Sequence, residues 1–189
     1  MPEVSVLIPC YNCESTIDNA LQTIASQDHP DFEAVLVDDG STDGTLAKLN
    51  AWAEMDARFR VLPVEHGGII HALNEGIKDC RGDFIARMDA DDRSYPTRLS
   101  KQAQVLRENP EISVVSCLVD GFPAEDVRMG FQLYLEWLNS LVTHEEIITC
   151  RFIESPVVHP STMVRKAELI ELGGYQEHGW AEDYDLWLR

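Results

Sequence analysis

The stretch FEAVLVDDGSTDGTLAKLNAWAEM, residues 32–55, contains the unit from which this protein is built. Residues 32–39 form an apolar run that ends in two aspartates, which is typical of a buried strand that reaches a polar edge. Gly40 indicates a turn, and residues 41–55 carry apolar side chains at helical spacing. The stretch therefore predicts a strand followed by a helix, with paired carboxylates between them.

The same unit repeats along the first two thirds of the chain. Strands are expected at 4–9, 32–39, 59–64, 83–92 and 112–117, and helices at 15–27, 41–55, 68–80 and 96–109. Ser15 is the expected N-cap of the first helix. Repeated units of this length predict an α/β fold, with a mostly parallel central sheet and helices on both faces. Ligands of such sheets bind beyond the carboxyl ends of the strands, which makes the loops at 9–14, 38–43 and 89–92 the candidate site.

After residue 120 the alternation of strands and helices stops. One helix is expected over residues 130–148, with an apolar stripe formed by Phe131, Tyr134, Leu138 and Leu141. Such a stripe favours contact with the core over a bound hydrophobic ligand. Residues 159–175 predict a short strand and then a helix that ends at paired glycines. The last helical pattern reaches Arg189 without a C-cap, which indicates that more protein follows.

Composition narrows the classes of function. The chain has 189 residues, 44% of them hydrophobic, which suits one domain with a sizeable core. A formal net charge of −18 disfavours nucleic acid as a partner, but it allows one phosphate site that a divalent cation neutralises. The N-terminus lacks the pattern of a signal peptide, and no apolar run approaches the roughly 20 residues of a membrane-spanning helix. Together with an odd number of cysteines, five, this predicts a cytoplasmic protein with reduced thiols.

Two acidic clusters stand at expected strand ends. The first is Asp38 and Asp39, and the second is Asp89, Asp91 and Asp92. Neighbouring carboxylates repel each other and are costly to desolvate, and a hard divalent cation such as Mg²⁺ supplies the compensating charge. Aspartate also caps helices at strand–helix junctions, so the first cluster alone is as consistent with a cap as with a site. Both clusters at carboxyl ends of parallel strands favour a site.

These motifs, in this order and spacing, resemble the family 2 inverting glycosyltransferases of the GT-A fold. The resemblance covers essentially the whole chain and rests on IPCYNCE (8–14), VDDGSTDGT (37–45), ALNEGI (72–77), ARMDADD (86–92) and EDYDLWLR (182–189). ESPVVHPSTM (154–163) also resembles a segment of bacterial members that build surface polysaccharides. The resemblance implies a single Rossmann-like GT-A domain over residues 1–189. Its nucleotide-sugar-binding half is expected at 1–118 and its acceptor-side half at 119–189.

The resemblance also implies an activity and its site residues. A sugar would move, with inversion, from a nucleotide diphosphate, most often a UDP-sugar, to a hydroxyl of a saccharide or lipid-linked saccharide. Mg²⁺ or Mn²⁺ would bind the diphosphate, with Asp91 as the first candidate ligand, Asp92 as the second and His159 as an additional one. Asp39 is expected at the uracil ring. The full set of expected donor contacts is Pro9, Tyr11, Glu14, Asp38, Asp39, Asn74 and Asp89.

The acceptor hydroxyl is a poor nucleophile and needs a base near its proton. The resemblance assigns this role to Asp183, with Glu182 beside it on the acceptor side and Asp185 as the nearest rival. Trp180 could stack on an acceptor sugar or pack at the edge of a helix. Arg87, on the strand before the second acidic cluster, could pair with those acids or help the leaving diphosphate. Without the other motifs, the acids at 182–185 would be read as favourable charges in a first helical turn.

Two other functions stay open from the sequence. A non-catalytic nucleotide-sugar-binding module is one, although the intact acids argue against it. A nucleotidyltransferase is the other, although it normally carries a basic, glycine-rich loop near the N-terminus, and the CYNCES segment (10–15) has neither feature. The absence of an apolar span suits a cytoplasmic enzyme, with peripheral association at the inner face of the cell membrane as a further option.

Cys10 and Cys13 have the C-x-x-C spacing of a redox or zinc site. The remaining cysteines stand alone in the sequence. Four histidines, at 66, 71, 144 and 178, show no spacing typical of metal ligands. Because the transferase motif surrounds the two cysteines, we interpret them as residues that fill positions within the first nucleotide-binding loop.

Overall fold

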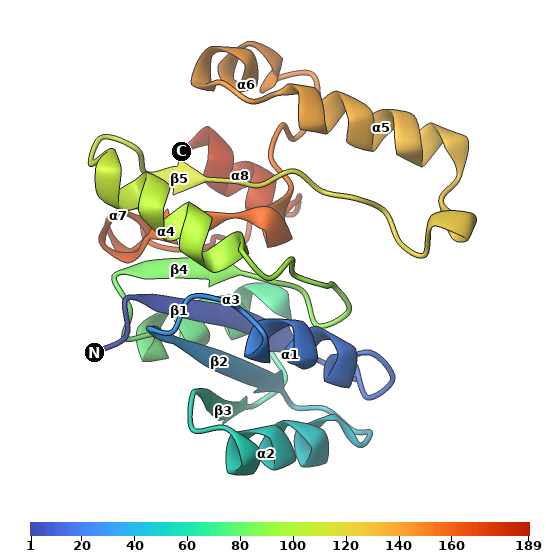
Figure 1. The fold of residues 1–189 in the computed structure, drawn as a ribbon, viewed down its shortest axis with the longest axis vertical. Coiled ribbons are helices and arrows are strands. Elements are labelled where there is room, and N and C mark those ends of the chain that lie inside the picture. The colour runs from blue at the N-terminus through green and yellow to red at the C-terminus, as the bar shows by residue number, and fades with distance from the viewer.

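The computed structural model describes residues 1–189 and contains a six-stranded sheet in the order β3-β2-β1-β4-β6-β5 (Figure 1). The strands are β1 (Val4–Cys10), β2 (Phe32–Asp39), β3 (Phe59–Val64), β4 (Phe84–Arg87), β5 (Val114–Val115) and β6 (Met163–Arg165). Strands β3, β2, β1 and β4 are parallel, and β6 runs antiparallel to both of its neighbours. The predicted mostly parallel α/β sheet is confirmed.

Helices cover both faces of this sheet. One face packs against α1 (Ile17–Ala25), α2 (Thr45–Met55) and α4 (Arg98–Glu108), and the other against α3 (Ile69–Asp79), α7 (Lys166–Glu171) and α8 (Glu182–Leu188). Strand β1 lies between β2 and β4 and is buried along its whole length. This explains its uninterrupted apolar run, because a strand covered on both faces has no polar side to alternate with.

Several elements are shorter than the sequence pattern predicts. Strand β4 ends at Arg87 rather than at residue 92, because the acidic residues leave the sheet and form a loop. Helix α2 begins at Thr45, since residues 41–44 bond to the loop after β1 instead of starting the helix. Ser15 is not an N-cap; Thr16 holds that position before α1 without a side-chain capping bond. The strand predicted at 112–117 is confirmed only at Val114–Val115.

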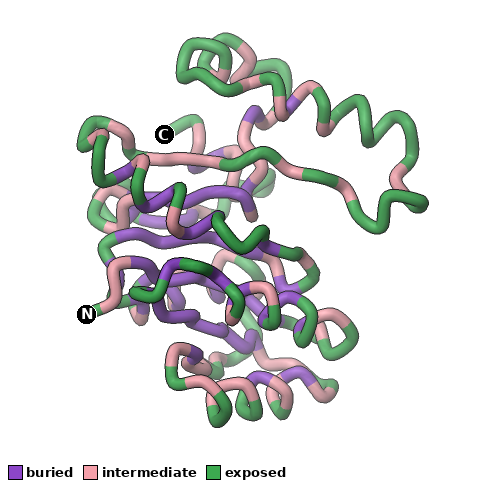
Figure 2. The backbone as a smooth tube through the Cα atoms, viewed as in Figure 1, coloured by how far each residue is buried: buried purple, intermediate pink, exposed green.

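The predicted helix over 130–148 is two helices, α5 (Met129–Ser140) and α6 (His144–Cys150). Thr143 starts α6 with a capping box, in which its hydroxyl and the Glu146 carboxylate bond each other's backbone N–H. The two helices lie beyond the β5 edge of the sheet (Figure 1). Figure 2 shows that most of this segment is exposed, whereas the sheet is buried. The expected core stripe is therefore wrong for Phe131, which is 52% exposed, and right for Leu138, which is 7% exposed.

The expected short strand and helix after residue 159 are confirmed as β6 and α7. Gly173 and Gly174 follow α7 with φ angles of 80° and 67°, a conformation that favours glycine at a helix C-terminus. A 3₁₀ turn at His159–Ser161 precedes β6, and another lies at Ala124–Asp126. None of the helices is both long and apolar enough to cross a membrane.

Gly76 lets α3 approach the sheet closely, and its substitution should destabilise the fold. A Cβ atom at this position would lie 2.2 Å from Leu7 Cδ1 and 2.9 Å from Val37 Cγ2. Overpacking of a core typically costs about 1–3 kcal/mol, and we expect Gly76→Ala to lower the free energy of unfolding by this amount. Urea unfolding measures the change. Gly130→Ala on α5 is the control, because its Cβ would have no neighbour within 4 Å. Equal stability of the two variants would contradict this account.

Candidate active site at the carboxyl edge of the sheet

A cavity of about 340 Å³ lies where β1 and β4 end. One wall is formed by residues of the segment 9–16, including Pro9 and Tyr11, and the other by residues 89–91. Two of the three loops that the sequence marked as candidates thus form one cavity at the carboxyl edge of the parallel strands. The third candidate loop, which follows β2, is joined to the loop after β1 by hydrogen bonds.

The loops after β1 and β2 are joined by side chains of the PCYNCE segment. Asn12 has a φ angle of 50°, and its Oδ1 accepts a hydrogen bond from Thr42 N at 2.8 Å. Its backbone N–H donates to Ser41 Oγ at 3.1 Å. Glu14 Oε2 accepts a bond from Gly44 N at 3.0 Å, so this carboxylate has a protein partner. The donor contact expected of Glu14 stays a prediction; in this structure the side chain holds the loop after β2 in place.

The first acidic pair is buried. Asp38 is 2% exposed and Asp39 is 3% exposed. The two carboxylate oxygens of Asp39 accept hydrogen bonds from Gly67 N and Gly68 N, both at 2.9 Å. Asp38 Oδ2 accepts a longer bond from Ser41 N at 3.4 Å. The carboxylates thus bond to N–H groups of the loops that follow β2 and β3, while Asp38 Oδ1 is buried without a hydrogen-bond partner. The expected contacts of this pair with the donor stay predictions.

Tyr11 presents an exposed aromatic ring at the same edge of the sheet. It is 47% exposed and stacks on His66, with ring centroids 4.2 Å apart and planes 20° apart. His66 Nδ1 in turn lies 2.9 Å from the carbonyl oxygen of Asp39. Sequence reasoning missed His66 because it tested the histidines only for metal spacing. Its place just after β3, at the same edge as the acidic loops, was the available indication.

The second acidic cluster leaves β4 next to a buried arginine. Arg87 is 4% exposed, and its Nη1 forms an ion pair with Asp89, as the sequence suggested. Asp91 is exposed on the cavity wall. Burial, together with the charges of Asp89 and Asp91, raises the pKa of Asp92 to about 6. The cluster therefore carries more negative charge than Arg87 alone neutralises.

The raised pKa of Asp92 predicts a pH effect in chelator-treated protein. The folded-state pKa of about 6 exceeds the ordinary 3.8, so the folded protein holds this proton more tightly than the unfolded chain does. The resulting stabilisation is at most about 3 kcal/mol. It has its full value below about pH 4 and is lost as the pH rises to about 6. Urea unfolding of wild type and Asp92→Asn across this range should show a larger loss in wild type, because the raised pKa of Asp183 acts in both proteins. Parallel pH profiles would contradict it.

Asp183 approaches this cluster from the first turn of α8. Burial raises its pKa, and the charge of Asp89 adds to the rise while Arg87 opposes it, so the three side chains share one electrostatic environment. The rival carboxylate, Asp185, is buried and forms an ion pair with Arg189 Nε at 2.8 Å. Asp185 therefore stabilises the last turn of α8, whereas Asp183 lies near enough to the β4 loop to be affected by the charges of Arg87 and Asp89.

His159 and Asn74 have structural partners. His159 Nε2 lies 2.7 Å from the Tyr175 hydroxyl, and burial followed by the charge of Arg87 lowers the pKa of His159 to about 2. The imidazole is neutral, so its 4.0 Å approach to Glu182 is not an ion pair. The Asn74 amide donates to Tyr175 O at 2.9 Å and accepts from Tyr175 N at 3.0 Å. The metal-ligand role of His159 and the donor contact of Asn74 stay predictions, and both side chains also have a structural role through Tyr175.

Tyr175 is the residue that sequence reasoning missed in this part of the site. It is 5% exposed and joins His159 to Asn74, which lie 16 and 101 residues away in the sequence. No local pattern marks such a residue. Through these bonds α3 positions the segment that leads into α8, and with it Asp183.

The pattern that defines glycosyl transferase family 2 matches residues 5–173. The chain belongs to this family. Among curated relatives, a putative glycosyltransferase, EpsE, of Bacillus subtilis is 35% identical over 100% of this chain and 66% of its own length. The O-antigen biosynthesis glycosyltransferase WbnJ of Escherichia coli is 30% identical over 98% of this chain and 70% of its own length. An uncharacterized glycosyltransferase of Haemophilus influenzae is 30% identical, and this chain spans 59% of it.

Solved structures of glycosyltransferases share the fold. S. aureus TarS in complex with UDP-GlcNAc superposes with a TM-score of 0.76 at 27% identity, over 97% of this chain and 51% of that chain. The mannosyltransferase PcManGT from Pyrobaculum calidifontis, in complex with GDP-Man and Mn²⁺, gives a TM-score of 0.73 at 27% identity, over 97% and 50%. This family 2 chain thus spans about half the length of these solved chains.

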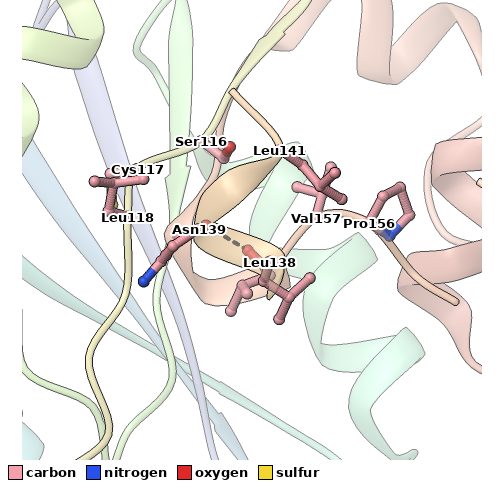
Figure 3. Close-up of a pocket in the computed structure, with 10 residues that line it drawn as sticks. Ser116, Cys117, Leu118, Leu138, Asn139, Leu141, Pro156 and Val157 are labelled. Atoms are coloured by element: carbon pink, nitrogen blue, oxygen red, sulfur yellow. Dashed lines mark hydrogen bonds between the residues drawn. The ribbon is translucent and has the colours of Figure 1, made fainter. Parts of the chain in front are cut away.

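A second cavity of this family 2 chain, about 180 Å³, lies between the segment after β5 and helix α5. Figure 3 shows Cys117 and Leu118 on one side of it and Pro156 and Val157 on the other. Asn139 fixes this region, because its amide donates to Val119 O and accepts from Val119 N. No Asp or Glu lines this cavity, so it lacks the acidic side chains that are found at the β4 loop.

Proposed function

We propose that this chain is the catalytic domain of an inverting glycosyltransferase. It transfers a sugar from a nucleotide diphosphate, with UDP as our first choice, to a hydroxyl of a saccharide or lipid-linked saccharide. One observation carries the proposal: a single cavity at the carboxyl edge joins the first loop to Asp89 and Asp91, and Asp183 shares the electrostatic environment of Asp89. Family membership and the nucleotide sugars bound by TarS and PcManGT support it.

The nucleotide occupies the end of the cavity at the first loop. The exposed ring of Tyr11 stacks on His66 and offers a flat surface for a base. Asp39 acts indirectly, by holding the loop of Gly67 and Gly68 with both of its oxygens. The uracil contact expected of Asp39 stays part of the proposal, beside this positioning role.

The acidic loop suits a divalent cation, Mg²⁺ or Mn²⁺. Asp91 is exposed on the cavity wall, and the raised pKa of Asp92 reflects burial and uncompensated neighbouring charge. No group of three or more ligand side chains gathers anywhere in the chain, and one or two carboxylates plus phosphate oxygens are the usual Mg²⁺ set. Asp91 and Asp92 would hold the ion. When bound there, it stabilises the charge that grows on the leaving diphosphate.

Asp183 is the base that takes the proton of the acceptor hydroxyl. Its pKa is raised chiefly by burial, which makes it a better proton acceptor than an ordinary aspartate. Arg87 has the opposite effect and keeps the carboxylate ionised. The amide of Tyr184 donates to Asp183 Oδ1 at 2.8 Å and fixes the orientation of the group. The remaining oxygen has no protein partner among the hydrogen bonds of this turn and is the one offered to the acceptor.

The acceptor approaches from the side of residues 119–189. Trp180 is 48% exposed and packs edge-on against Tyr184, 5.6 Å away, next to the base. An aromatic face at this position suits the C–H face of a sugar ring, and Glu182 supplies a neighbouring hydrogen-bond acceptor. We also propose that the enzyme is cytoplasmic and works at the inner face of the cell membrane, where a lipid-linked acceptor would be reached.

Calorimetry with UDP, GDP and their sugars, with and without Mn²⁺, tests the donor site. We expect UDP to bind at least about tenfold more tightly when Mn²⁺ is present, since the ion bridges carboxylates and diphosphate. Release of free UDP from a UDP-sugar would separate an enzyme from a non-catalytic binding module. A reduced, folded protein that binds no nucleotide under any condition would overturn the proposal.

A further inference from the structure

Cys10 and Cys13 form a pair of free thiols at the start of the candidate donor loop. Cys10 is the last residue of β1 and is 1% exposed. Cys13 is partly exposed and lines the cavity. The chain bends between them, where Asn12 has a φ angle of 50°, and Cys13 packs against the buried cluster that contains Cys10. The pair is thus arranged for chemistry between its two sulfurs.

The surroundings distinguish the two thiols. Thr45 Oγ1 donates to Cys13 Sγ at 3.8 Å, and the interaction with Cys10 followed by this bond lowers the pKa of Cys13. The interaction with Cys13 and then burial raise the pKa of Cys10. Cys10 Sγ donates to Ile8 O at 3.5 Å, inside the core. Cys13 is therefore the thiol that ionises first and meets solvent, and Cys10 is the protected partner.

The other cysteines lack this arrangement. Burial raises the pKa of Cys80 to about 12, whereas Cys117 is exposed and Cys150 is partly exposed, and none of the three has a second cysteine near it in the sequence. A zinc site is excluded on the donor set, because no group of three or more cysteine, histidine or acidic side chains is gathered in the chain. Reversible thiol–disulfide exchange is the chemistry that a pair of thiols without a metal can carry out.

The residues between the two cysteines shape the cavity. Tyr11 stacks on His66, and Asn12 bonds to the backbone N–H of Thr42. Cys13 N donates to Thr45 Oγ1 at 2.8 Å and completes the link to the loop after β2. A covalent bond from Cys10 to Cys13 would close a ring that contains Tyr11 and Asn12. Any adjustment that this bond needs is therefore transmitted directly to the aromatic surface at the nucleotide end of the cavity.

We propose that Cys10 and Cys13 form a redox-active dithiol that reacts with small disulfides such as oxidised glutathione, and that the oxidised form binds the donor poorly. The thiolate of Cys13 attacks one sulfur of the small disulfide, breaks its S–S bond and releases one thiol. Cys10, after loss of its proton, attacks the Cys13 sulfur of the mixed disulfide and releases the second thiol. The protein is oxidised by two electrons, the small disulfide is reduced, and the two thiol protons end on the two released thiols.

Mass spectrometry tests the thiol chemistry. Folded protein is incubated with oxidised glutathione, capped with iodoacetamide, digested and mapped. We expect a Cys10–Cys13 disulfide that is lighter than the dithiol by about 2 Da, the mass of two hydrogens. Cys10→Ala should stop at a glutathione adduct on Cys13, because the second step is lost. Cys117→Ser, which alters a thiol outside the pair, should behave as wild type.

Two results of this experiment would overturn the proposal. One is a wild-type peptide that carries iodoacetamide on both Cys10 and Cys13 while other cysteines have reacted with glutathione. The other is an adduct on Cys13 of the wild type that never proceeds to the internal disulfide. Both readouts come from the thiols alone and are independent of any nucleotide or sugar.

The consequence for the cavity rests on the proposed function and needs a second measurement. Calorimetry with UDP and Mn²⁺ compares reduced protein, oxidised protein and oxidised protein treated again with dithiothreitol. We expect at least about tenfold weaker binding after oxidation and full recovery after reduction. Unchanged affinity in a protein shown to carry the disulfide would refute the effect on the cavity. Absence of binding by reduced protein would instead refute the donor site, and the mass measurement would still decide the thiol chemistry.

Discussion

Asp183→Asn should reduce the rate of sugar transfer by about 10²–10⁴-fold, the range that general bases contribute. The amide keeps the size of the side chain and can still accept the bond from Tyr184 N, but it cannot take the proton of the acceptor hydroxyl. Donor affinity should stay within about twofold, because the donor cavity is lined by other residues. Release of UDP from a UDP-sugar in the presence of acceptor, followed over time, measures the rate.

The pH profile sharpens this prediction. Because burial raises the pKa of Asp183, the wild-type rate should fall on the acid side at a pH above the ordinary range of an aspartate. Asp185→Asn is the matched control. Its carboxylate pairs with Arg189, so its loss should lower the free energy of unfolding while the pH profile stays in place. A fully active Asp183→Asn would remove Asp183 as the base.

Asp91→Ala should abolish the dependence of UDP binding on Mn²⁺ and lower transfer by about 10³-fold or more, since the ion stabilises the leaving diphosphate by several kcal/mol. Asp91 is the exposed acid of the cavity wall, and no neighbouring histidine or cysteine completes a ligand set that could replace it. Calorimetry with and without Mn²⁺ measures the effect. Binding of UDP without metal should persist, because Tyr11 and its loop are unchanged.

Stability separates this result from misfolding. The charge of Asp91 is one cause of the raised pKa of Asp92, so its removal relieves repulsion in the cluster. Asp91→Ala should therefore be at least as stable as wild type near neutral pH. Asp126→Ala, an exposed acid in the turn at 124–126, is the control and should keep the response to Mn²⁺. A response to Mn²⁺ that survives in Asp91→Ala would shift the ligand role to Asp92 or Asp89.

Most of the sheet and the position of the cavity were predictable from the sequence. The strand–helix units place the carboxyl ends of β1, β2 and β4 at one edge, and that edge carries the acidic residues. Helix boundaries were less predictable. The delayed start of α2 depends on bonds from Asn12 and Glu14, which lie in another loop. The break between α5 and α6 was readable in principle, since Thr143 and Glu146 have the spacing of a capping box.

Sequence motifs identified the correct segments but not the task of each side chain. Glu14, Asn74 and Asp39 are part of the motifs, yet each of these side chains also bonds to backbone groups of a neighbouring segment. His66 and Tyr175 have no motif that the sequence reading used, yet one stacks on Tyr11 and the other bonds His159. A residue in a motif can serve the structure of a loop as well as the chemistry of the site.

The sequence by itself determined the alternation of strands and helices, the family, and the chemical character of the two acidic loops. These follow from local periodicity and from residues that are close in the chain. The tertiary structure alone decided which carboxylates remain available. Asp39 is buried and accepts hydrogen bonds from Gly67 and Gly68, whereas Asp91 is exposed at the cavity. Hydrogen bonding and burial depend on partners that are distant in sequence, and only the folded chain brings these together.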